Sequence, residues 1–80
     1  MNINQRNLDG IKTAREDYKV MAFIRTRGNY CLAIIHRMNC TCQPYVFCKG
    51  YDVTYGTWGA GTYCETYDGA LHEMCAYLTK

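Results

Sequence analysis

The chain lacks the segments that mark a membrane, repeat or disordered protein. Its 80 residues contain no internal repeat, no low-complexity tract and no apolar run near the ~18 residues that span a bilayer. Hydrophobic residues make up 49% of the sequence and charged residues 20%, proportions typical of a globular protein. No apolar stretch follows Arg6, so we expect no secretory signal and a cytoplasmic location. These absences predict one domain over residues 1–80.

Recognisable catalytic motifs are also lacking. The chain has no phosphate-binding Gly-Lys-Ser/Thr loop, and His72-Glu73 lacks the second histidine of a helical zinc-protease motif. An isolated histidine such as His36 or His72 is more often structural than catalytic. A Cys/His nucleophile pair stays open, because such pairs meet in space and not in the sequence. We expect a protein that is not an enzyme and that needs no cofactor.

Cysteine, in contrast, is abundant. The chain has six: Cys31, Cys40, Cys42, Cys48, Cys64 and Cys75. In a secreted chain this number would indicate a disulfide framework, but no secretory signal accompanies it. Cys31 and Cys75 lie within apolar runs, where a thiol fills the core like a small hydrophobic side chain. The sequence therefore favours free, buried thiols.

Two other uses of the cysteines stay open. Four soft ligands lie close together in the sequence, which zinc would accept in a tetrahedron: His36, Cys40, Cys42 and Cys48. Their spacing lacks the usual Cys-x2-Cys pairs, so a zinc-stabilised module is an alternative and no metal is predicted. A disulfide from Cys40 to Cys48 is the other alternative.

Charge is distributed unevenly along the chain. Residues 1–17 are balanced, residues 18–51 carry five basic side chains and no acidic one, and residues 52–80 sum to −3, for a net charge of +2. The basic middle could pair with the acidic end inside one fold. It could also form a surface that binds anions.

Two adjacent runs rich in β-branched and aromatic residues predict strands at 18–26 and 30–38. Gly28-Asn29 between them predicts a two-residue hairpin turn. Pairing Arg27 with Tyr30 would set Val20 opposite Arg37. That register places the small and branched residues of both strands on the face that suits a closely packed helix.

The second half of the chain predicts two further strands. Residues 45–53 form the third, with a break at Gly50, and residues 62–65 form a short fourth strand. Residues 54–61 between them predict a glycine-rich turn that carries Tyr55 and Trp58.

A helix is expected after the last strand. Thr66 has the side chain of an N-cap residue, and Asp68 suits the positive end of a helix. Apolar residues then recur at helical spacing: Leu71, Met74, Cys75 and Leu78. The polar residues 1–16 predict only a weak, short helix. The expected fold is α+β, an antiparallel sheet of about four strands with the C-terminal helix packed on one face.

One helix would leave much of the second sheet face uncovered. A domain of this size buries only about 60% of its unfolded surface, and an exposed apolar face predicts a partner. We therefore expect a homodimer or higher oligomer.

Tyrosine is unusually frequent, with eight in the chain. Aromatic side chains with polar tips suit protein interfaces and also stack on nucleotide bases, although strands favour aromatic residues in any case. We predict a contact surface on the hairpin of the third and fourth strands: Tyr51, Tyr55, Trp58 and Tyr63. Basic side chains would supply contacts to anions: Arg25, Arg27, Arg37 and Lys49.

The same hairpin carries a resemblance. Residues 50–63 contain Tyr51-Asp52, Trp58-Gly59-Ala60-Gly61 and Tyr63, and Ala70-Leu71 opens the helix after them. This pattern resembles small uncharacterised proteins encoded by phages and prophages of Gram-positive bacteria. The resemblance implies a counter-defence protein that inhibits a bacterial immune factor by direct binding, as anti-CRISPR proteins do. The chain is not strongly acidic, so mimicry of DNA charge is disfavoured.

The same context implies a second class of function. Some phage proteins are oligomeric sponges that sequester an immune signalling nucleotide. Here Arg25, Arg27 and Arg37 would bind its phosphates and the tyrosines would stack on its bases. The expected partners are thus a host defence complex or a signalling nucleotide, with no membrane.

Overall fold

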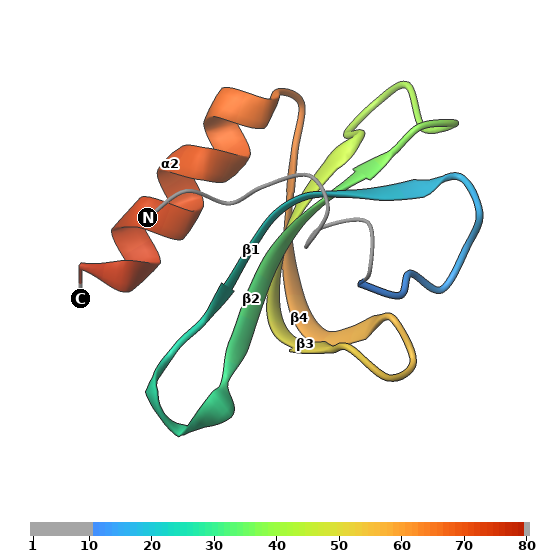
Figure 1. Ribbon diagram of the computed structural model, residues 1–80. Coiled ribbons are helices and arrows are strands. Elements are labelled where there is room, and N and C mark those ends of the chain that lie inside the picture. Colours follow the sequence, from blue (N-terminus) through green and yellow to red (C-terminus); the bar gives the residue numbers. More distant parts are fainter. Residues whose placement is uncertain (1–10, 80) are drawn as a thin grey trace.

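The computed structural model describes residues 11–79, which form one four-stranded antiparallel sheet and one α-helix (Figure 1). The sheet order follows the chain, β1-β2-β3-β4, and the helix covers one face. The elements are β1 (Tyr18–Arg25), a short 3-10 turn η1 (Arg27–Asn29), β2 (Cys31–Arg37), β3 (Tyr45–Asp52), β4 (Thr57–Cys64) and α2 (Tyr67–Leu78). The predicted α+β class is confirmed. Most of the predicted N-terminal helix lies outside the described residues, and residues 11–17 are not helical.

The register between β1 and β2 differs from the predicted one. The turn contains three residues, Arg27–Asn29, and Thr26 N donates to Tyr30 O at 2.8 Å. A β-bulge between Val20 and Ala22 then shifts the pairing again, so that Val20 lies opposite Ile35 and not Arg37. The prediction was wrong because a bulge leaves one residue without a partner and local sequence does not mark it.

The bulge decides which residues face the helix. Before it, Val20 lies with Ala33 and Ile35 on the face away from α2. After it, Ala22 joins Leu32 on the face that α2 covers. The helix therefore packs on Leu32 and Ile34 of β2 together with Ala22 of β1. The predicted face of small and branched residues is divided between the two sides of the sheet, so the expectation that the helix covers it is wrong.

Helix α2 begins where the sequence predicts and is rotated from the predicted stripe. Thr66 Oγ1 accepts a hydrogen bond from Gly69 N at 3.0 Å, which confirms the N-cap. Ala70 and Met74 are the buried residues of the helix. Cys75 and Leu78 are exposed, because the contacting face also uses two tyrosines that the aliphatic pattern omitted: Tyr67 and Tyr77.

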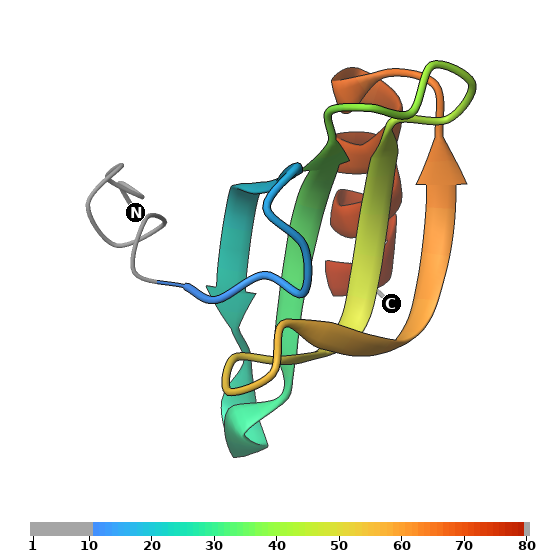
Figure 2. The ribbon, with the colours of Figure 1, turned by 90° about the vertical axis from the view of Figure 1, so that its right-hand side faces the viewer.

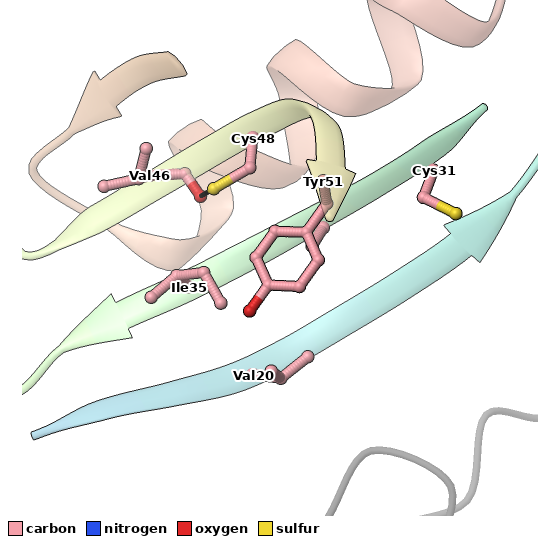
Figure 3. Packing of buried hydrophobic residues seen from close by; sticks show 7 residues of the cluster. Val20, Cys31, Ile35, Val46, Cys48 and Tyr51 are labelled. Atoms are coloured by element: carbon pink, nitrogen blue, oxygen red, sulfur yellow. Dashed lines mark hydrogen bonds between the residues drawn. The ribbon is translucent and has the colours of Figure 1, made fainter. Parts of the chain in front are cut away.

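The second sheet face is covered from within the chain. Beyond Gly50, whose φ is 68°, the β3–β4 hairpin bends across this face (Figure 2). Tyr51 thereby lies over Ile35 and Val20, and it is only 4% exposed (Figure 3). The expectation of an uncovered apolar face is wrong. Self-association was expected because that face would be exposed, so this argument for an oligomer no longer applies.

Residues 11–17 complete this cover and meet the hairpin turn. Tyr51 Oη donates to the carbonyl oxygen of Lys12 at 2.6 Å. A Cβ at Gly56 would lie 2.5 Å from the carbonyl carbon of Thr13, so the two backbones are in direct contact. Strand β4 is longer than predicted, because it includes glycines that were assigned to the turn. An indole packs over one of them: Trp58 Nε1 would lie 3.0 Å from a Cβ at Gly61.

Candidate functional site

A pocket lies where residues 14–18 meet the β3–β4 turn. Its volume is about 260 Å³, and its lining residues are Ala14, Arg15, Tyr18, Gly56, Thr57 and Trp58. The two segments are distant in the sequence, and the Tyr51–Lys12 hydrogen bond and the Gly56 contact hold them together. The pocket therefore depends on the bend in the hairpin.

Aromatic rings form one wall of this pocket. The Trp58 ring lies 6.1 Å from the ring of Tyr18, tilted by 34°, and 6.3 Å from the ring of Tyr51, nearly parallel at 14°. Burial raises the pKa of Tyr51 to about 12, so its phenol stays neutral and donates to Lys12. Tyr51 supports Trp58 from the core, and the contact role predicted for it does not fit its burial.

A positive charge lies at the mouth of the pocket. The guanidinium carbon of Arg15 is 5.9 Å from the centre of the Tyr18 ring, and Arg15 Nε is 3.2 Å from Asp17 Oδ1. The Arg15 side chain is 66% exposed, and an ion pair so exposed to water adds little stability. Asp17 Oδ2 also accepts from Asn39 Nδ2 at 3.3 Å. Arg15 can therefore leave Asp17 for an anionic group at small cost.

The arrangement suits a flat or apolar group with a negative end. Trp58 and Tyr18 offer ring faces, and Arg15 offers the charge. Sequence reasoning selected Trp58 by its residue type and missed Arg15 and Tyr18. No local pattern shows that the residues before β1 meet the β3–β4 turn.

The other predicted aromatic residues lie apart from each other. Tyr55 is 67% exposed, in the turn beside Gly56 of the pocket. Tyr63 is 44% exposed and lies at the other end of β4, where the guanidinium carbon of Arg37 is 4.8 Å from its ring centre. The predicted contact surface is therefore divided into two, one beside Trp58 and one around Tyr63.

The predicted basic residues do not form one patch. Arg25 and Arg27 are exposed beside the β1–β2 turn. Arg37 lies at the opposite end of β2. Lys49 Nζ lies 5.8 Å from the ring centre of Phe47, on the face that α2 covers. A single chain does not bring these charges to one anion.

The zinc alternative fails on geometry. His36 stacks on Tyr45, with ring centres 4.6 Å apart, at the face covered by α2. Cys48 is buried in the cluster on the opposite face, where burial raises the pKa of its thiol to about 12. Between residues 11 and 79 no three His, Cys, Asp or Glu side chains are grouped so that they could hold a metal ion.

The cysteines are buried only in part. Cys31 lies in the core as predicted, and Cys48 is buried as well. Cys75, which was predicted to fill a core position, is exposed on α2. Cys40 and Cys42 lie on the loop between β2 and β3, the first half-buried and the second exposed. Cys40 and Cys48 are separate thiols.

Comparisons with known proteins give no relative. None of the helices described within residues 11–79 has the length and apolar character of a membrane-crossing segment. The chain matches no protein-family model, and searches of curated proteins and of solved structures find no match either.

Proposed function

We propose that the chain is a non-enzymatic phage counter-defence protein. In this proposal it acts in the cytoplasm of the infected bacterium and inhibits an immune factor of the host by binding it directly. The resemblance of the hairpin over residues 50–71 supports the class of protein. The pocket beside the β3–β4 turn supports the mode of action.

One observation carries the mode of action. Trp58 is half-buried between Tyr18 and Tyr51, so its indole is held in place before any partner arrives. Tyr55, the most exposed large hydrophobic residue described, lies in the adjoining turn. Rigid aromatic anchors of this kind contribute much of the binding energy of protein interfaces, because they lose little side-chain entropy on binding.

A plating assay tests this proposal. The chain is expressed in hosts that each carry one defence system, and the plating efficiency of a phage sensitive to that system is measured. We expect one system to be inhibited, and the purified chain to bind a purified component of that system. Failure to inhibit any system in the panel would count against the class.

Surface variants then test the pocket. Tyr55→Ala and Arg15→Ala change exposed side chains and leave the core intact, so they should fold and lose inhibition. Leu78→Ala, at an exposed position on α2, is the matched control and should inhibit normally. Full inhibition by the Tyr55→Ala, Arg15→Ala double variant would refute this surface.

The same pocket favours a second candidate, the sequestration of a signalling nucleotide. Trp58 and Tyr18 could stack on a base, and Arg15 could bind a phosphate. These residues replace the set Arg25, Arg27 and Arg37, which the fold separates. Calorimetry with cyclic dinucleotides and ADP-ribose tests this candidate. If the chain sequesters a nucleotide, one of these ligands should give heat of binding, and Arg15→Ala should reduce that heat. The absence of heat with every ligand would overturn this candidate function.

A further inference from the structure

The loop between β2 and β3 holds two cysteines that the proposed function does not use. Cys40 N donates to the carbonyl oxygen of Arg37 at 3.0 Å, which fixes Cys40 directly after the end of β2. Cys40 is half-buried, and Cys42 is exposed two residues later. The loop therefore presents a held thiol beside an accessible one.

The backbone of the loop stabilises the ionised form of Cys40. The backbone N–H groups of Gln43 and Cys42 favour the thiolate and are the main causes that lower the pKa of Cys40. These two donors, and the nearby Arg37 guanidinium, lower the pKa of the Cys40 thiol, while partial burial opposes them. A lower pKa raises the fraction of the thiol that is ionised at a given pH, and the thiolate is the nucleophilic form of cysteine.

The position of Arg37 is fixed by the same loop. Its Nη2 donates to the carbonyl oxygen of Gln43, and its guanidinium lies over the ring of Tyr63 at 4.8 Å. Its Nε is buried and finds no hydrogen-bond acceptor among residues 11–79. The loop therefore has a spare, charged donor, which favours negative charge nearby.

Asp17 faces this loop, and Glu16 lies beside it in a hollow that Asn39 also lines. Asp17 accepts from Met38 N through its backbone carbonyl and from Asn39 Nδ2 through its carboxylate. That carboxylate is also paired with Arg15. The negative charge of Asp17 is thus partly balanced by Arg15, and the net effect of the surroundings on Cys40 is a lowered pKa.

We propose that Cys40 is a nucleophilic thiol that exchanges with low-molecular-weight disulfides, and that Cys42 is its resolving partner. The Cys40 thiolate attacks one sulfur of a disulfide RSSR, forms the mixed disulfide Cys40–S–S–R and releases RS⁻. The Cys42 thiolate then attacks the Cys40 sulfur, forms the Cys40–Cys42 disulfide and releases the second RS⁻. The two cysteines lose two electrons in total, RSSR gains two, and the two thiol protons pass to the released thiolates. The site is independent of the pocket at Trp58.

Alkylation rates test the first step. The reduced protein is treated with iodoacetamide between pH 6 and 9, and each cysteine-containing peptide is quantified by mass spectrometry. At pH 7 we expect Cys40 to react roughly fivefold or more faster than Cys75, although Cys75 is the more exposed thiol. Cys75, on α2, is an internal control in the same molecule. Equal rates at Cys40 and Cys75, with equal pH profiles, would overturn the proposal.

Oxidised glutathione tests the second step. Wild-type protein should lose two hydrogens and form the Cys40–Cys42 bond, whereas Cys42→Ser should accumulate a glutathione adduct on Cys40. Cys40→Ser should form neither product at this loop. A stable adduct on Cys40 of the wild type, or a first adduct on Cys42, would refute the assignment of roles.

Arg37 is a positioning residue in this proposal. Arg37→Lys should slow the alkylation of Cys40 severalfold and shift its pH profile upward, because a compact ammonium lacks the planar guanidinium that donates to Gln43 and lies over Tyr63 at the same time. The rate at Cys75 should not change. A slowing of both thiols equally would indicate a general effect on the fold and would contradict the role of Arg37.

Discussion

The contact between Gly56 and Thr13 provides the sharpest test of how the second sheet face is covered. The backbone φ of Gly56 is 73°, a conformation that costs a residue with a Cβ about 1 kcal/mol. In Gly56→Ala the new methyl group would also lie 2.5 Å from the Thr13 carbonyl carbon and 2.6 Å from Ala14 N. Two backbone segments cannot both stay in place at these distances.

The variant must therefore push residues 11–17 off the hairpin. That movement removes the Tyr51–Lys12 hydrogen bond, whose loss costs about 1 kcal/mol. The loss of this bond adds to the cost of the backbone conformation, so we expect Gly56→Ala to lower the free energy of unfolding by about 2–3 kcal/mol. The matched control is Gly28→Ala, because Gly28 has a similar φ of 76° and nothing lies within 4 Å of an added Cβ. Gly28→Ala should lower the free energy of unfolding by at most about 1 kcal/mol.

Urea unfolding followed by tryptophan fluorescence measures both effects. Trp58 is the only tryptophan in the chain and lines the pocket, so its native emission should also shift to longer wavelength in Gly56→Ala as water reaches the ring. Gly28→Ala should leave that emission unchanged. Equal stabilities and equal native spectra of the two variants would refute the seating of residues 11–17 on the turn.

Three further predictions concern the two cores and the helix. The stability of the protein should fall as the pH rises through 10 toward 12, because burial raises the pKa of Tyr51 to about 12 and the tyrosine of the unfolded chain ionises first. In Tyr51→Phe this decline, measured by urea midpoints, should be smaller. An identical decline in the variant and the wild type would contradict the role of Tyr51. Met74→Ala should lower the free energy of unfolding by about 2–4 kcal/mol because Met74 is 3% exposed, whereas Cys75→Ala should change it by less than about 0.5 kcal/mol. A loss at Cys75 as large as that at Met74 would restore the predicted stripe, which contains both residues. Thr66→Ala removes the N-cap hydrogen bond from Gly69 and should lower the free energy of unfolding by about 1 kcal/mol, measured by thermal unfolding. Thr66→Ser keeps the hydroxyl and should keep that stability. Equal losses in the two variants would argue against the cap.

Local sequence predicted the elements well. The strands lie within one or two residues of their predicted limits where β-branched runs define them, as in Tyr18–Arg25 and Cys31–Arg37. The N-cap at Thr66 was also found, because its donor comes from Gly69, three residues away. Interactions of short range leave a pattern that can be recognised in one sequence.

Long-range geometry could not be predicted in this way. The bulge between Val20 and Ala22 places these two residues on opposite faces of the sheet, and no local residue pattern announces it. The bend at Gly50 was noted as a break, but its direction, which carries Tyr51 across the sheet, depends on the finished fold. Arg15 was missed for the same reason, since it enters the pocket only when two distant segments meet.

The same arrangement has a consequence for solubility. Five consecutive residues of β2 from Cys31 to Ile35 are buried, alternately by the helix and by the bent hairpin. The run contains no charged residue and no proline, and such uncharged strand segments pair readily between chains when they are uncovered. Opening either cover would expose one side of this strand. Variants that loosen the contact of residues 11–17 should therefore aggregate at concentrations where the wild type stays dispersed.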